Sequence, residues 1–326
     1  MRIGGVPEHY NAPVHKAIEK SREDNQIDWI TYRSGTGAML EALDRGELDM
    51  AILLTEGAVK HALTSSQNPS VSIMGTFVDS PLPWGVHVSA TGRLQSLSDV
   101  NDNIDTLTFG ISRMGSGSHL MGVVHASTLS GKRLPRFSIV NTMAGARDAM
   151  AKGEIDVFLW DITTADVYAR EGVWKCIGTV SGNWPAFVFA VRSDTSPVLL
   201  EKLSCFIDLL RSESAQMKAA NNGSSVAYLV DKYSITEEQA SEFIKRISWN
   251  SSLHVDRSAL ERVVTALRSA GVLPKLPANA VVDLHGLIVA KKSVLVYLLS
   301  RSVCNRILSF QWKWRIWPNP TCTTGA

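Results

Sequence analysis

One nine-residue pattern occurs twice in the chain at a constant offset of 107 residues, and it limits the fold more than any other feature. The first copy reads ALDRGELDM over residues 42–50, and the second reads AMAKGEIDV over residues 149–157. Each copy has a base and a glycine after a helical pattern, then an acid before a very apolar segment. A base and a glycine are typical of a helix C-terminus. The repeat therefore predicts two similar α/β units.

Strand-like and helical segments alternate along the chain as far as residue 195, and the chain is almost entirely helical from there to residue 271. The strand-like segments are nearly all apolar rather than alternating, which is typical of strands buried on both faces. The predicted fold class is α/β. We expect two similar lobes, each with a mainly parallel sheet flanked by helices, a ligand cleft between the lobes and a helical C-terminal part.

The repeat and the change to helix suggest a discontinuous division of the chain. The expected first lobe comprises residues 1–83 and 193–283, and the second comprises residues 84–192. Pro83-Trp84 and Trp184-Pro185 fall where the chain would cross between lobes, so Trp84 and Trp184 are hinge candidates. Residues 284–326 are expected to form a basic, apolar extension outside the fold.

Composition excludes several classes of protein. A chain of 326 residues with 45% hydrophobic and 20% charged residues is typical of a globular protein of two domains or lobes. The net charge is only +2, and the 284–326 segment carries six bases and no acid, so the rest is mildly acidic and predicts no nucleic-acid groove. The four cysteines show no metal-ligand spacing, which fits a reducing compartment. The opening MRIGGVPEHY resembles no secretory signal and no apolar run could span a bilayer, so we expect a cytoplasmic protein.

The segment LTFGISRMGSGSHLMG, residues 107–122, has the residue order of an anion-binding turn. A short apolar strand leads into a turn of small residues, and a helical pattern follows. That order directs main-chain N–H groups and the positive end of a helix at an anion. Ser116 or Ser118 also suits a helix cap, and both roles use the same geometry. The turn residues are Ser112, Gly115, Ser116, Gly117 and Ser118.

Two facing α/β lobes would bring the loops after their strands to one cleft. The expected first-lobe groups are His9, Tyr10, Asn11, Gly35, Thr36, Thr55 and Glu56. The expected second-lobe groups are the turn residues, His119 and Asp161, with Asn141 and Thr142 nearby. His119 would donate to a ligand or lie at the surface. His9 and its neighbour Glu8 would either contact the ligand or simply be exposed. Glu56 would accept from a ligand amine or simply favour the start of its own helix.

Five motifs in this order resemble the type 2 periplasmic-binding-protein superfamily, in particular the ABC-transporter solute-binding proteins for nitrate, sulfonate and taurine. The motifs are GGVPEHYNAP, GTGAMLEALDRGELDMAILLTEG, SRMGSGSHLMG, GEIDVFLWD and NWPAFVFAVR. The resemblance spans residues 1–283 and implies a ligand between the lobes. It places the acidic group of that ligand on the Ser112–Ser118 turn and adds the seven first-lobe contacts named above. The SRxGSGSH form and the absent leader resemble an intracellular eukaryotic branch.

Two functions remain open on this resemblance. The first is a solute-binding-protein-like binder of a small anionic or zwitterionic metabolite of the sulfonate, carboxylate or phosphate type. The alternative is an enzyme resembling the thiamine-pyrimidine precursor synthase, whose cysteine cluster this sequence lacks. The sequence has no common catalytic motif, so we expect a binding protein with no catalytic residue, no cofactor and no metal. Contact of the 284–326 extension with a membrane is the less favoured reading of that segment.

Overall fold

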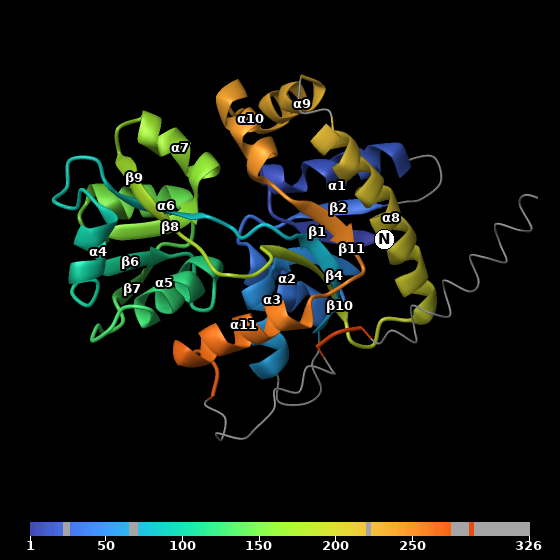
Figure 1. Cartoon of the computed structure of the whole chain (residues 1–326), viewed down its shortest axis with the longest axis horizontal. Helices are drawn as coiled ribbons and strands as arrows, with labels where there is room; N and C mark the ends of the chain where they lie inside the picture. Colours follow the sequence, from blue (N-terminus) through green and yellow to red (C-terminus); the bar gives the residue numbers. More distant parts are fainter. Residues whose placement is uncertain (22–26, 65–70, 220–222, 275–286, 290–326) are drawn as a thin grey trace, which may run out of the picture.

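The computed structural model describes residues 1–21, 27–64, 71–219, 223–274 and 287–289, which form two α/β lobes (Figure 1). The chain begins with β1 (Arg2–Gly5), the 3-10 helix η1 (His9–Asn11), α1 (Ala12–Ser21), β2 (Asp28–Thr31), α2 (Thr36–Asp44), β3 (Met50–Leu54), α3 (Thr55–Thr64) and β4 (Val71–Val78). The second lobe contains β5 (Trp84–Ser89), α4 (Leu97–Asn103), β6 (Thr108–Ile111), α5 (Gly117–Ser127), β7 (Arg136–Ile139), α6 (Met143–Ala151), β8 (Val157–Asp161), α7 (Ile162–Arg170) and β9 (Trp174–Val180). The chain then returns to the first lobe through β10 (Phe187–Arg192), α8 (Pro197–Ala219), α9 (Ser224–Tyr233), α10 (Glu237–Arg246), β11 (Trp249–Ser252) and α11 (Arg257–Ser269).

Each sheet contains an equivalent set of three parallel strands, as the repeat predicts. The first lobe has a six-stranded sheet in the order β11-β4-β10-β3-β1-β2, and the second has a five-stranded sheet in the order β7-β6-β8-β5-β9. In the first, β1 lies parallel between β2 and β3; in the second, β6 lies parallel between β7 and β8. The two-lobe α/β prediction is confirmed.

The repeated glycines end equivalent helices. Gly46 follows α2 with φ 69°, and Gly153 follows α6 with φ 71°. In each copy the residue after the glycine donates its amide back into the helix, to the carbonyl of Ala42 at 2.8 Å or of Ala149 at 2.9 Å. This is the hydrogen-bond pattern of a glycine-terminated helix.

The repeated acids join neighbouring parallel strands. The Asp49 carboxylate accepts the Arg2 main-chain N–H at 2.7 Å, and the Asp156 carboxylate accepts the Thr108 main-chain N–H at 2.8 Å. Each acid therefore satisfies the first amide of the central strand beside it. The nine-residue pattern encodes a complete junction, in which one helix ends and two strands are set side by side.

Each sheet is mixed, whereas the sequence predicted mainly parallel sheets. β10 is antiparallel to β3 and β4, and β5 is antiparallel to β8 and β9. The physical reason lies in the connections. A parallel partner needs a crossover helix, but β5 and β10 arrive directly from the other lobe through short segments and therefore enter antiparallel.

Two segments lie elsewhere than the sequence suggested. Phe187–Arg192 was expected in the second lobe, but as β10 it pairs within the first sheet. Its apolar residues carry no signal for one buried sheet over the other. Leu287–Val289 was expected outside the fold, but Ile73 donates its amide to the Leu287 carbonyl at 2.7 Å and accepts from the Val289 amide at 3.0 Å. The rest of the 284–326 extension, with its proposed membrane contact, lies outside the described residues.

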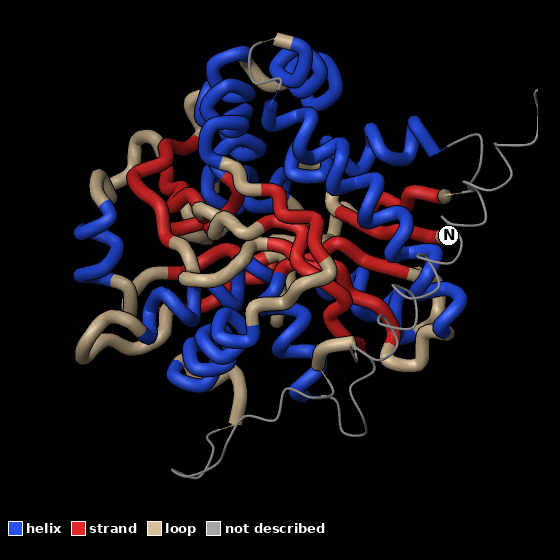
Figure 2. The backbone as a smooth tube through the Cα atoms, turned by 45° about the vertical axis from the view of Figure 1, so that its right-hand side comes forward, coloured by secondary structure: helices blue, strands red, loops and turns tan. Residues whose placement is uncertain are grey.

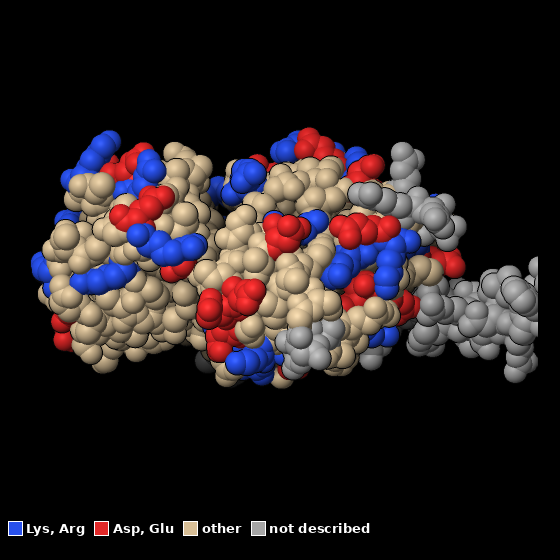
Figure 3. Space-filling model, turned by 90° about the horizontal axis from the view of Figure 1, so that it is seen from above, with Lys and Arg blue, Asp and Glu red and all other residues tan. Residues whose placement is uncertain are grey.

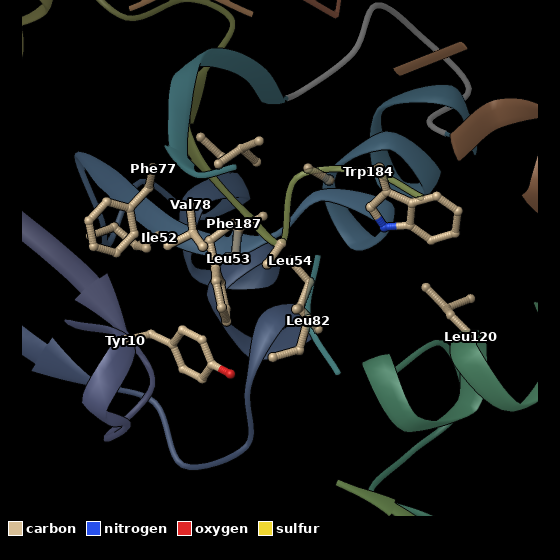
Figure 4. Close-up of a cluster of buried hydrophobic side chains, with 14 of the residues drawn as sticks. Tyr10, Ile52, Leu53, Leu54, Phe77, Val78, Leu82, Leu120, Trp184 and Phe187 are labelled. Carbon is tan, nitrogen blue, oxygen red and sulfur yellow. The ribbon is translucent and has the colours of Figure 1, made fainter. Parts of the chain in front are cut away.

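The apolar core continues from one lobe to the other. In Figure 4, Leu120 of α5 faces Trp184, which lies between β9 and β10, and both belong to one cluster of buried side chains. Helix α11 packs against α3 of the first lobe and α5 of the second (Figure 1). Figure 2 shows the strands of both lobes enclosed by helices. None of the helices in the described ranges combines the length and hydropathy needed to cross a membrane.

Candidate functional site

A cavity of about 380 Å³ lies between the lobes, at the carboxyl ends of the two parallel cores. Successive parallel strands end at the same edge, so the helices that follow them begin around one space. The amino ends of α2, α5, α6 and α7 all contribute to the wall. Of the predicted residues, those that line it are Gly35, Thr36, Trp84, Ser112, Ser116, Gly117, Ser118 and Asp161, together with Glu8 and Thr142.

The α5 turn has the hydrogen bonding of a preformed anion site. The Ser116 hydroxyl accepts the His119 amide at 3.4 Å and lies 3.1 Å from the Ser118 hydroxyl, which in turn accepts the Ser112 amide at 3.3 Å. The side chains thus hold the turn without using the first helical amides, those of Gly117 and Ser118. Such amides have no acceptor within a helix and face its open positive end.

Gly117 lies where the turn packs closely against Leu54 of the first lobe and Trp84 of β5. A Cβ atom there would come within 2.5 Å of Leu54 Cδ1 and 2.6 Å of Trp84 Cη2. A larger residue here would require these side chains or the lobes to shift, so glycine suits the close packing of the turn against β3 and β5.

Gly115 and His119 support the turn from outside the cavity. His119 Nδ1 accepts the Gly115 amide at 3.0 Å, and its ring packs edge-on to Phe137 at 4.7 Å. Burial, assisted by the charge of Lys60, lowers the pKa of His119, so the neutral, accepting form is favoured. The structure thus shows His119 bonded to its own turn; the sequence could not predict this, because it depends on the rotamer.

Asp161 and Tyr10 join the lobes beside the cavity. Tyr10 Oη donates to Asp161 Oδ2 at 3.1 Å, while Asp161 Oδ1 accepts the Thr164 amide at 2.9 Å and caps α7. Burial and the negative charge of Asp161 raise the pKa of Tyr10, which stays a donor. Arg113 Nη1 adds a second bond across the cleft, to the Ser34 carbonyl.

His9 and Asn11 are buried within the first lobe rather than in the cavity wall. His9 packs edge-on to Phe243 at 4.2 Å, and burial lowers its pKa. Asn11 Nδ2 donates to the Val6 carbonyl at 2.7 Å and fixes the loop after β1. Their places in the sequence at the end of β1 are as expected, but their side chains point into the protein.

Thr55 and Glu56 hold the chain segment that returns from the second lobe. Thr55 donates its amide to the Ala186 carbonyl at 3.2 Å and its hydroxyl to the Pro185 carbonyl at 2.6 Å. Trp184 Nε1 donates to Glu56 Oε2 at 3.1 Å, and burial raises the pKa of Glu56 to about 7. Thr55 thus holds Pro185 and Ala186, and Glu56 holds the hinge candidate Trp184.

Several groups that line the cavity were absent from the predicted site. Arg33 adds a positive charge, and the larger apolar contributors are Met39, Leu54, Leu82, Met143, Trp160, Tyr168 and Phe187. Glu8, for which ligand contact and exposure were both open, lines the cavity. Trp160 and Phe187 lie in buried apolar strands, where their sequence signal cannot be distinguished from that of core residues. No group of three or more His, Cys, Asp or Glu side chains in the described ranges is placed to hold a metal ion.

Comparison with known proteins agrees with this architecture. Residues 84–180, which run from β5 to β9, match the family described as Ca3427-like periplasmic binding proteins. The fold is similar to that of the conserved CA3427 gene product of Candida albicans, with 23% identity and a TM-score of 0.78 over 88% of this chain and 95% of that one. Comparison with curated proteins found no match.

Two bacterial binding proteins also have this fold. The alkanesulfonate-binding protein SsuA from Xanthomonas axonopodis pv. citri, bound to MOPS, is 16% identical with a TM-score of 0.66, over 84% of this chain and 94% of that one. The periplasmic aliphatic sulphonate binding protein SsuA from Escherichia coli is 16% identical with a TM-score of 0.62, over 89% and 97%. The chain therefore has the type 2 periplasmic-binding-protein fold, and its second lobe matches the Ca3427-like family.

Proposed function

We propose that the protein binds a small anionic or zwitterionic metabolite of the sulfonate, carboxylate or phosphate type in the cleft between its lobes. The observation that carries the proposal is the α5 turn, because its three serines and Gly117 line the interlobe cavity. The amides of Gly117 and Ser118 and the positive end of an eleven-residue helix would face the anion there.

The remaining walls suit an organic anion. Trp84, Trp160 and Tyr168 supply aromatic surface to the cavity, and Arg33 supplies a positive charge. An apolar wall excludes water and strengthens the few polar contacts that set orientation. In Figure 3, by contrast, lysine and arginine are interspersed with aspartate and glutamate over the visible face. That face therefore shows no patch of a single charge that would attract an oppositely charged partner. The two SsuA proteins with this fold are sulfonate-binding proteins.

Isothermal titration calorimetry would test the proposal with Ser116→Ala and Ser118→Ala. The probes are propanesulfonate, butanoate and ethyl phosphate, each with and without a terminal amine. The Ser116 and Ser118 hydroxyls line the cavity beside these amides and would also donate to the anion. A hydrogen bond to a charged group contributes about 1.5–3 kcal/mol, so each variant should lose at least about tenfold in affinity for the probe that binds. Ser127→Ala is the matched control, because Ser127 lies at the far end of α5 and donates only to the Val124 carbonyl.

Thermal unfolding of each variant separates binding from folding, since loss of the Ser116 cap alone costs about 1 kcal/mol. Wild-type affinity in both folded cleft variants, or binding of no probe by the wild type, would contradict the proposed anion site.

A further inference from the structure

The cavity has an acidic wall as well as the anion turn. Glu8 follows β1 in the first lobe, Asp161 ends β8 in the second, and both line the same space. Both Asp161 carboxylate oxygens already accept hydrogen bonds, Oδ1 from the Thr164 amide and Oδ2 from the Tyr10 hydroxyl. The Glu8 carboxyl, in contrast, has no hydrogen bond or ion pair to any of the residues that the structure describes.

The groups around this wall leave Glu8 without a positive partner from the protein. Burial and the negative charge of Asp161 raise the pKa of Glu8 to about 8. The adjacent His9 is neutral because burial lowers its pKa, and Tyr10 is held as a neutral donor. The positive charge of Arg246 further lowers the pKa of His9 and partly offsets the raised pKa of Tyr10. Burial lowers the pKa of His87 to about 4, so it adds no positive charge, and Arg33 and Tyr168 line the cavity without a hydrogen bond to Glu8.

A carboxyl group in this position costs free energy when ionised, unless a cation joins it. A ligand ammonium or protonated ring nitrogen would supply that cation, and its apolar part would rest on the aromatic side chains of Trp160 and Tyr168. If the cavity had no acidic partner, a ligand ammonium would lose its bound water on entering and form no ion pair in return, so the amine would weaken binding.

We propose that the ligand is a zwitterion, with its anionic group on the α5 turn and its protonated nitrogen against Glu8, with Asp161 adding negative charge from the other lobe. Glu8 thus takes the amine-accepting role considered for Glu56 from its sequence position, because the Glu56 carboxyl holds Trp184 instead. The inference rests on the proposed function. The α5 turn belongs to the second lobe and Glu8 to the first, so a zwitterion bound at both would bridge the two lobes.

The test compares the amino and non-amino member of each probe pair by calorimetry, in the wild type and in Glu8→Gln. We expect the wild type to bind the amino member at least about tenfold more tightly, and Glu8→Gln to bind both members with equal affinity. At pH 7, titrations in buffers of different ionisation enthalpy should show proton release from the wild type with the amino member only. Glu154→Gln is the control, since Glu154 is exposed and distant from the cavity wall.

The outcomes separate the two proposals. Equal affinity of the wild type for both members of every pair, with sensitivity to Ser118→Ala, overturns the zwitterion inference and supports the anion site. A tenfold preference that persists in folded Glu8→Gln overturns the assignment to Glu8. Binding of no probe overturns the proposed function and the inference with it. The proton-release measurement uses the wild type alone, so it decides the matter even if Glu8→Gln fails to fold.

Discussion

Tyr10→Phe removes one hydroxyl group and leaves the ring packing in place, so it isolates a single bond between the lobes. Tyr10 Oη donates to the Asp161 carboxylate at 3.1 Å in a buried setting. A hydrogen bond to a charged group contributes about 1.5–3 kcal/mol. The bond exists only when the lobes are together, so its loss should shift the equilibrium toward an open form by that amount.

The expected result is a loss of about 10- to 100-fold in affinity for the probe that binds in the cleft, at about 1.4 kcal/mol for each factor of ten. Calorimetry measures the affinity, and small-angle X-ray scattering measures the radius of gyration with and without the probe. Tyr10→Phe should be more expanded than the wild type without probe.

Tyr233→Phe is the matched control for this experiment. Its hydroxyl is buried and has no hydrogen-bond partner among the described residues, so its removal breaks no contact between the lobes. If Tyr10→Phe and Tyr233→Phe show the same affinity and the same radius of gyration, the Tyr10–Asp161 bond does not hold the lobes together and the reasoning is refuted.

Three further predictions concern closure, pH and the repeat. Gly117→Ala places a methyl group 2.5 Å from Leu54 Cδ1, so it should weaken probe binding measured by calorimetry; unchanged affinity would show that the lobes adapt. Burial raises the pKa of Glu56 from 4.5 to about 7, so the folded state favours the protonated acid and stability should fall as pH rises from about 4.5 through 7. Urea unfolding should show that the unfolding free energy of Glu56→Gln falls less over this pH range than that of the wild type or of the control variant Glu154→Gln. If Glu56→Gln and Glu154→Gln lose the same unfolding free energy, this reasoning is refuted. Asp156→Ala leaves the first amide of β6 without its acceptor and should lower the unfolding free energy by about 1–3 kcal/mol, whereas an unchanged urea midpoint would contradict that role.

The two-lobe fold could be predicted from the sequence because the repeated residues make short-range interactions. Gly46 and Gly153 end helices, and Asp49 and Asp156 bond to the adjacent strand, all within a few residues of one junction or between parallel neighbours. Such features depend on local conformation, which residue type constrains strongly. The sheet partner of Phe187–Arg192 depends instead on the other lobe, and its apolar residues suit any buried strand.

The candidate site could be predicted only as far as loop position allows. The strand-to-helix order located the turn of Ser116 and Ser118, and both line the cavity. Residue order does not say which way a side chain points, so Glu56 was expected to face a ligand although it bonds to Trp184. Trp160 was missed for the opposite reason, because an aromatic residue in a buried strand resembles core until the facing lobe is in place.

The most direct test of the anion site is a crystal structure of the protein with MOPS, the sulfonate bound by the Xanthomonas SsuA protein. The proposal predicts sulfonate oxygens about 2.7–3.2 Å from the main-chain nitrogens of Gly117 and Ser118. A sulfonate bound elsewhere, or a cleft that stays empty at saturating MOPS while another anion binds away from the α5 turn, would contradict it.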